Sequence, residues 1–92
     1  MLILTQLTED TFEHDFNDFK GSSIIDLKEI TFIDPYGMVG LLELGEISLS
    51  QGVQKKLILP TTEDVLKDLE RMDFFQFAEK YFILGSLYIK PG

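Results

Sequence analysis

The sequence contains no cysteine, so disulfide bonds, thiolate nucleophiles and thiolate metal sites are excluded, and the composition fits a reducing compartment. Basic residues are also scarce. Eight Lys and Arg stand against sixteen Asp and Glu, which gives a formal net charge of −8 at pH 7. This charge disfavours nucleic acid and anionic membranes as partners and favours a neutral or basic protein.

Long apolar runs are missing as well. No stretch approaches the roughly 18 consecutive apolar residues that cross a bilayer. The opening residues, MLILTQLTED, lack the basic start of a signal peptide and soon turn acidic. We therefore expect a cytoplasmic protein with no membrane-inserted segment. At 92 residues, 45% of them hydrophobic, the chain has the length for one core and not for two, so residues 1–92 are expected to form a single domain.

Known catalytic motifs are absent too: the sequence holds no glycine-rich phosphate loop, HExxH, GxSxG or EF-hand pattern. His14, the only histidine, is flanked by Glu13 and Asp15, and a solvated surface position is the preferred interpretation. Glu43 and Glu46 are three residues apart and could hold a metal or act as acid and base. Without His or Cys nearby, a solvated acidic face is favoured. We predict no enzyme and no cofactor, and keep a small nucleotide- or metal-binding domain as an alternative.

What the sequence does contain is an alternation of strand-like and helix-like segments. Short apolar, β-branched runs predict strands at 2–7, 22–27, 30–33, 56–60 and 84–89. Capping residues and helical spacing of apolar residues predict helices at 8–20 and 35–50 and from 61 or 62 through 72. This order predicts an α/β fold in which 22–27, expected to be buried on both faces, pairs in parallel with 56–60.

Aromatic residues are expected to mark the core. Phe12, Phe16 and Phe19 recur at helical spacing, so their rings are predicted to face the sheet. A second cluster lies between residues 74 and 82. The number of these aromatic residues indicates that they close the core instead of forming a base-stacking platform, which would need nearby basic charge. The members of this cluster are Phe74, Phe75, Phe77, Tyr81 and Phe82.

The chain is predicted to pass from strand to helix at Asp34-Pro35-Tyr36-Gly37. Asp34 is a favourable N-cap, and Pro35 fits the first helical position, where its missing N–H would have no partner. The strand should therefore end at Ile33 and the helix begin at Pro35. In strand-helix-strand folds such corners lie at the carboxyl ends of strands, where partners and ligands usually bind.

The helix after this corner has two different faces. At 100° per residue, one side is predicted to be core and contains Met38, Leu41, Leu42, Gly45 and Leu49. The other side mixes acids with apolar groups, and the chain has no Lys or Arg between Glu29 and Gln54. Exposed single apolar side chains are common on any protein, yet this stripe favours a partner-binding surface. The predicted surface consists of Asp34, Pro35, Tyr36, Gly37, Val39, Glu43, Glu46 and Ile47.

Several of these segments occur together in one known family. They are Ile24-Ile25-Asp26-Leu27-Lys28, Thr31-Phe32-Ile33-Asp34, Gly37, Leu41-Leu42, Gly52, and the run from Pro60 to Phe75. In this order they resemble a small STAS domain, the fold of bacterial anti-sigma factor antagonists. The resemblance covers roughly residues 24–77. It implies a single small domain with a mixed β-sheet and helices, and a regulatory module that acts by partner switching.

The resemblance also defines the expected partner. In the antagonist family the corner reads Asp-Ser-Ser/Thr-Gly, and a partner that is both kinase and anti-sigma factor phosphorylates the hydroxyl before the glycine. Pro35 and Tyr36 replace the hydroxyl residues here, so no phosphoacceptor serine or threonine is predicted at this site. We expect a histidine-kinase-type ATPase or anti-sigma factor as partner, with Tyr36 as an anchor. An accessory subunit of a membrane transporter is the alternative, and the sequence leaves a homodimer open.

Overall fold

The structure is a computed structural model that describes residues 1–85. Its strands are β1 (Leu2–Ile3), β2 (Gln6–Leu7), β3 (Ile24–Asp26), β4 (Phe32–Ile33), β5 (Lys56–Ile58) and β6 (Ile83–Gly85). Its helices are α1 (Glu9–His14), α2 (Phe16–Gly21), α3 (Pro35–Ser50), α4 (Glu63–Arg71) and α5 (Phe74–Tyr81). The alternation confirms the predicted α/β class. The last predicted strand, 84–89, is described only in part, since residues 86–89 lie outside the described residues.

Four strands form the main sheet in the order β1-β3-β5-β6, and β2 and β4 form a second pair beside it. The predicted parallel pairing is confirmed, with Ile25 opposite Leu57 in β3 and β5. The prediction of a mixed sheet is wrong for residues 1–85, because every pairing there is parallel. Successive strands of the main sheet are joined through helices, which return the chain to the same end of the sheet.

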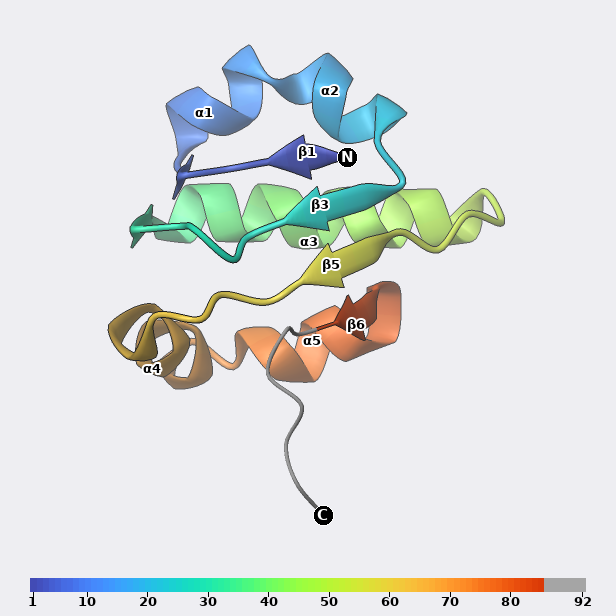
Figure 1. Cartoon of the computed structure of the whole chain (residues 1–92). Helices are drawn as coiled ribbons and strands as arrows, with labels where there is room; N and C mark the ends of the chain where they lie inside the picture. Colours follow the sequence, from blue (N-terminus) through green and yellow to red (C-terminus); the bar gives the residue numbers. More distant parts are fainter. Residues whose placement is uncertain (86–92) are drawn as a thin grey trace.

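Helices cover one face of the main sheet (Figure 1). α3 and α5 lie behind it in this view, α1 and α2 lie along its β1 side, and no described helix crosses the face toward the viewer. Ile25 and Leu57 point toward the helices and are fully buried, whereas Ile3 and Ile83, on the other face, are 51% and 52% exposed. The strand at 22–27, predicted to be buried on both faces, therefore has helices on one face only. When parallel strands follow one another across a sheet in sequence order, right-handed connections place all their helices on the same face of that sheet.

The N-terminal helical segment differs from its prediction. Thr8 is the N-cap, its hydroxyl accepting a hydrogen bond from the Thr11 N–H, but the expected single helix is broken at Asp15 into α1 and α2. Because of this break the three phenylalanines no longer share one buried face. Phe19 is fully buried and Phe12 partly buried, while Phe16 is 43% exposed. The prediction that all three rings face the sheet is wrong.

α3 lies between α1 and α5, and its buried side is rotated from the predicted one. Leu44 and Ser48 are buried, whereas Leu49, predicted as core, is 38% exposed. Gly45 was expected to allow close approach to the sheet, but a Cβ there would lie 2.5 Å from the ring of Phe82. The rotation follows from contact with two helices, one on each side, in place of contact with the sheet alone.

The C-terminal aromatic cluster belongs mainly to α5. Phe74 and Phe82 are buried and close the core as predicted, while Phe77 is 43% exposed and lies outside it. α4 begins after Thr62, and the hydroxyl of Thr61 donates to the Lys28 carbonyl, 3.1 Å away. Across residues 1–85, no helix combines the length and the apolar character needed to cross a bilayer.

Candidate functional site

The strand-to-helix corner forms as predicted, with β4 ending at Ile33 and α3 beginning at Pro35. The Asp34 carboxylate caps α3, since Oδ1 accepts a hydrogen bond from the Gly37 N–H at 2.7 Å. Its Oδ2 accepts one from the Glu9 N–H at 3.3 Å, in the first turn of α1. One carboxylate therefore stabilises the N-terminal ends of two helices, where free N–H groups and the helix dipoles favour negative charge.

Gly37 is required by a close crossing of the chain. A Cβ at this position would lie 2.5 Å from the carbonyl oxygen of Leu7 and 2.8 Å from the amide nitrogen of Thr8. A side chain at this position would force the backbone of α3 or of residues 7 and 8 to shift. Asp34 and Gly37, both predicted as partner-binding residues, thus face inward and hold α3 against the end of β2. The outward half of the corner consists of Pro35 and Tyr36, and Tyr36 is 71% exposed.

From this corner an exposed strip runs along α3, which we name the outer surface and define as Tyr36, Val39, Glu43, Glu46 and Ile47. Val39 is 48% and Ile47 55% exposed, and both glutamates are exposed. Residues three or four apart are neighbours on a helix, so Tyr36, Val39, Glu43 and Ile47 form one continuous line. The predicted exposure of this side of the helix is confirmed. The outer surface therefore carries both apolar and acidic side chains over about three turns of α3.

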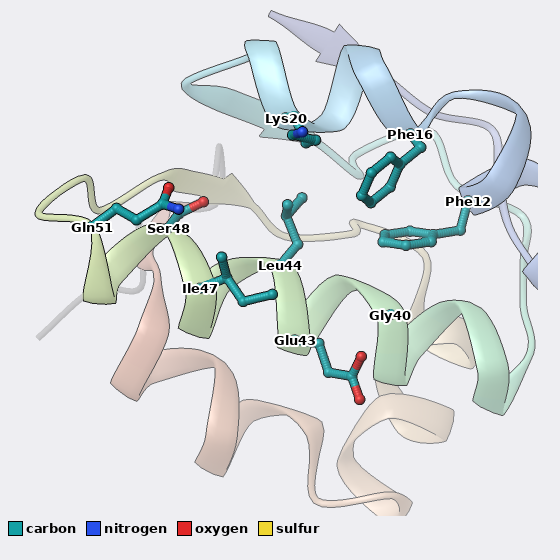
Figure 2. Close-up of a pocket in the computed structure, with 9 residues that line it drawn as sticks. All are labelled: Phe12, Phe16, Lys20, Gly40, Glu43, Leu44, Ile47, Ser48 and Gln51. Carbon is teal, nitrogen blue, oxygen red and sulfur yellow. The ribbon is translucent and has the colours of Figure 1, made fainter.

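Beside the outer surface lies a groove of about 420 Å³ between α1, α2 and α3, shown in Figure 2. Its lining consists of Phe12, Phe16, Lys20, Gly40, Glu43, Leu44, Ile47, Ser48 and Gln51. Glu43 and Ile47 belong to both the groove and the outer surface. The two features therefore form one connected surface region.

The aromatic wall of the groove is built by the broken N-terminal helix. Phe12 contacts Phe16 edge-on, with ring centroids 5.7 Å apart, and contacts the buried Phe19 at 4.9 Å. The Lys20 ammonium lies 5.4 Å from the centre of the Phe16 ring. On the facing helix, the space that a Cβ of Gly40 would occupy is only 3.1 Å from the Phe12 ring. The sequence signalled an aromatic stripe here, but the break at Asp15 that turns Phe16 outward carried no local signal.

Comparison of the chain with models of protein families, with curated proteins and with solved structures finds no match. The resemblance to STAS domains therefore rests on sequence motifs alone. Function has to be inferred from the outer surface and the groove.

Within residues 1–85, no three or more His, Asp or Glu side chains are placed to hold a metal ion. Among residues 1–85 the buried charged residues are Asp26 and Lys55, and both form hydrogen bonds with backbone groups. Asp26 accepts a hydrogen bond from the Lys28 N–H at 2.9 Å, and Lys55 donates to the carbonyls of Lys20 and Ser22 at the end of α2. Burial lowers the pKa of the Lys55 ammonium.

His14 is exposed, as predicted, and its Nδ1 lies 2.8 Å from Oδ1 of Asp15. The hydrogen bond to Asp15 and its negative charge raise the pKa of His14 above its ordinary value of 6.5. A raised folded-state pKa means that the contact stabilises the fold below the unfolded value and ceases to do so as pH rises through the folded one. We expect an NMR titration to give a His14 pKa above 6.5, and Asp15→Asn to lower it. A His14 pKa that is the same in both proteins would contradict the contact.

Proposed function

We propose that this chain is a regulatory protein-binding module that holds its partner with the outer surface of α3. The observation that carries the proposal is the exposed line of Tyr36, Val39 and Ile47 on a helix whose opposite side already packs in the core. A helix that needs only one apolar face for folding carries a second one here. Exposed apolar side chains gathered on one side of a helix and rimmed by polar residues are typical of protein interaction sites.

The corner makes Tyr36 a suitable anchor. Pro35 precedes it, and the Asp34 carboxylate fixes the first turn of α3 through the Gly37 N–H. The backbone of Tyr36 is thus held before a partner arrives, so less conformational entropy is lost on binding. Tyrosine is also among the residues enriched at the energetic centres of interfaces.

Charge supports a neutral or basic docking surface on the partner. Glu43 and Glu46 are exposed on α3, and no Lys or Arg lies between Glu29 and Gln54. The STAS resemblance supports a histidine-kinase-type ATPase or an anti-sigma factor as the partner. With Pro35 and Tyr36 at the hydroxyl positions of that family, we propose that binding is constitutive or controlled elsewhere, not switched by a serine kinase at this corner.

Substitution of Tyr36 tests the proposal. The immobilised chain captures its partner from an extract of the source organism, and the purified pair is then measured by calorimetry. Tyr36→Ala is expected to weaken the complex by about 2 kcal/mol, or roughly 30-fold in Kd, because an anchor contact is lost. Since Tyr36 is 71% exposed, the variant should fold normally.

Phe77→Ala is the control, since Phe77 is an exposed aromatic residue on α5 and is not one of the residues that define the outer surface. Its affinity should stay within twofold of the unmodified chain. Equal affinities of the Tyr36 and Phe77 variants would disprove the anchor. Co-purification with a transporter permease or its ATPase subunit would instead support the transporter-accessory alternative.

A further inference from the structure

We infer that the groove receives an apolar side chain of the bound protein, and that a lysine or arginine near that side chain pairs with Glu43. The inference rests on the proposed function and specifies the chemistry of the partner segment. Its starting point is geometric: Glu43 and Ile47 line the groove and also belong to the outer surface. A chain bound along α3 would therefore pass the mouth of the groove.

The groove is suited to an apolar occupant. Phe12 and Phe16 form one wall, and Leu44 and Ile47 of α3 form the other (Figure 2). Gly40 has no side chain, which lets the Phe12 ring pack closely against α3, since a Cβ there would lie 3.1 Å from that ring. A volume of about 420 Å³ lies within the range of pockets that bind compact organic groups, roughly 300–1,000 Å³.

The aromatic wall is fixed before binding. Phe12 touches both Phe16 and the fully buried Phe19, so its ring is held from the core side. The Lys20 ammonium lies over the Phe16 ring and favours its present orientation. A wall held in this way loses little conformational freedom when a side chain enters, which favours binding.

The charges select a basic partner segment. Glu43 is an exposed carboxylate at the rim of the groove, and Glu46 adds a second on the same helix. Lys20 is the one cation among the lining residues, and its ammonium already lies near the face of the Phe16 ring. The potential along α3 is therefore negative, so a lysine or arginine is attracted and an acidic segment is repelled.

The test uses random 12-residue peptides displayed on phage and selected on the complete chain at physiological salt. The enriched peptides are expected to contain one large apolar residue with Lys or Arg within four positions. For the best soluble peptide, Phe16→Ala should reduce affinity at least tenfold. Glu43→Gln should reduce it severalfold and weaken its dependence on salt.

Phe77→Ala is a closely matched control. Phe77 and Phe16 are both 43% exposed, and Phe77 lies under Lys80 at 5.6 Å just as Phe16 lies under Lys20. Phe77 does not line the groove. Its substitution should change peptide affinity less than twofold. If Phe16→Ala fails to fold by circular dichroism, Ile47→Gln at a 55% exposed position serves in its place, with the same expected loss.

Three results would overturn the inference: no enriched peptide, an acidic consensus, or peptides that bind the Phe16 and Phe77 variants equally well. The proposed function fails separately. If Tyr36→Ala weakens the natural complex while Phe16→Ala does not, the outer surface binds the partner but the groove does not. If Phe16→Ala weakens peptide binding while Tyr36→Ala leaves the natural complex intact, the groove inference stands and Tyr36 is not the anchor.

Discussion

Replacing Gly37 by alanine is expected to lower the free energy of unfolding by about 3 kcal/mol, at the upper end of the range for overpacking. The added Cβ would lie 2.5 Å from the Leu7 carbonyl oxygen, and both contacting segments are backbone. To relieve this clash, α3 has to move away from the end of β2, and this movement breaks contacts that both elements make. Urea unfolding followed by circular dichroism measures the loss.

Gly21→Ala provides the matched control. Gly21 is also a helical residue, the last of α2, and a Cβ there would meet nothing within 4 Å. Alanine is the better helix former, so this variant should be as stable as the unmodified chain or slightly more stable. If the two glycine variants differ by less than about 1 kcal/mol, a typical effect of one substitution, the close crossing at Gly37 is disproved.

Asp34→Ala is expected to lower the free energy of unfolding by about 2–3 kcal/mol. An ordinary N-cap contributes about 0.5–2 kcal/mol, and here the same carboxylate accepts hydrogen bonds from the Gly37 and Glu9 N–H groups. Removing it leaves the Gly37 N–H of α3 and the Glu9 N–H of α1 without this acceptor. The measurement is again urea unfolding, with the slope compared to confirm that the extent of unfolding is unchanged.

Thr8→Ala is the comparison for Asp34. Thr8 caps α1 alone, through the Thr11 N–H, so its loss should amount to about 1 kcal/mol. Asp34→Asn retains one acceptor oxygen, so its loss of unfolding free energy should lie between those of Asp34→Ala and Thr8→Ala. An Asp34→Ala variant no less stable than Thr8→Ala would show that the carboxylate does not bridge the two helices in solution.

These two residues change the interpretation of the family resemblance. Asp34 and Gly37 are the positions of the corner that match the STAS pattern, and both face inward with structural contacts. Pro35 and Tyr36, the positions that depart from it, face solvent. The matching residues are thus explained by the close approach of α3 to β2. Any specific partner preference of this corner would come from the residues that differ.

Local signals sufficed for much of the fold. Thr8, Asp34 and Pro35 are residues whose own side chains favour a helix start, so these starts were predictable without knowledge of distant contacts. The parallel pair of β3 and β5 followed from the helix between them. The exposed side of α3 followed from its spacing, because acidic residues mark the solvent side of a helix.

The groove was not predictable in this way. Phe16 was expected in the core, but the helix breaks at Asp15 and leaves its ring at the surface facing α3. Leu49 was expected to be buried, yet Leu44 takes the inward position because α3 packs between α1 and α5. The spacing of apolar residues along a helix does not show on which sides of it segments distant in sequence will pack.

By itself, the sequence determined the absence of thiol chemistry, the acidic character, the α/β alternation and the position of the corner at residues 34–37. Each of these depends on composition or on interactions within a few residues. Only the tertiary structure decided that Asp34 caps two helices, that Gly37 is held against Leu7, and that a groove opens between α1, α2 and α3. These features depend on how segments about 25 residues apart meet, and packing of the whole chain sets that arrangement.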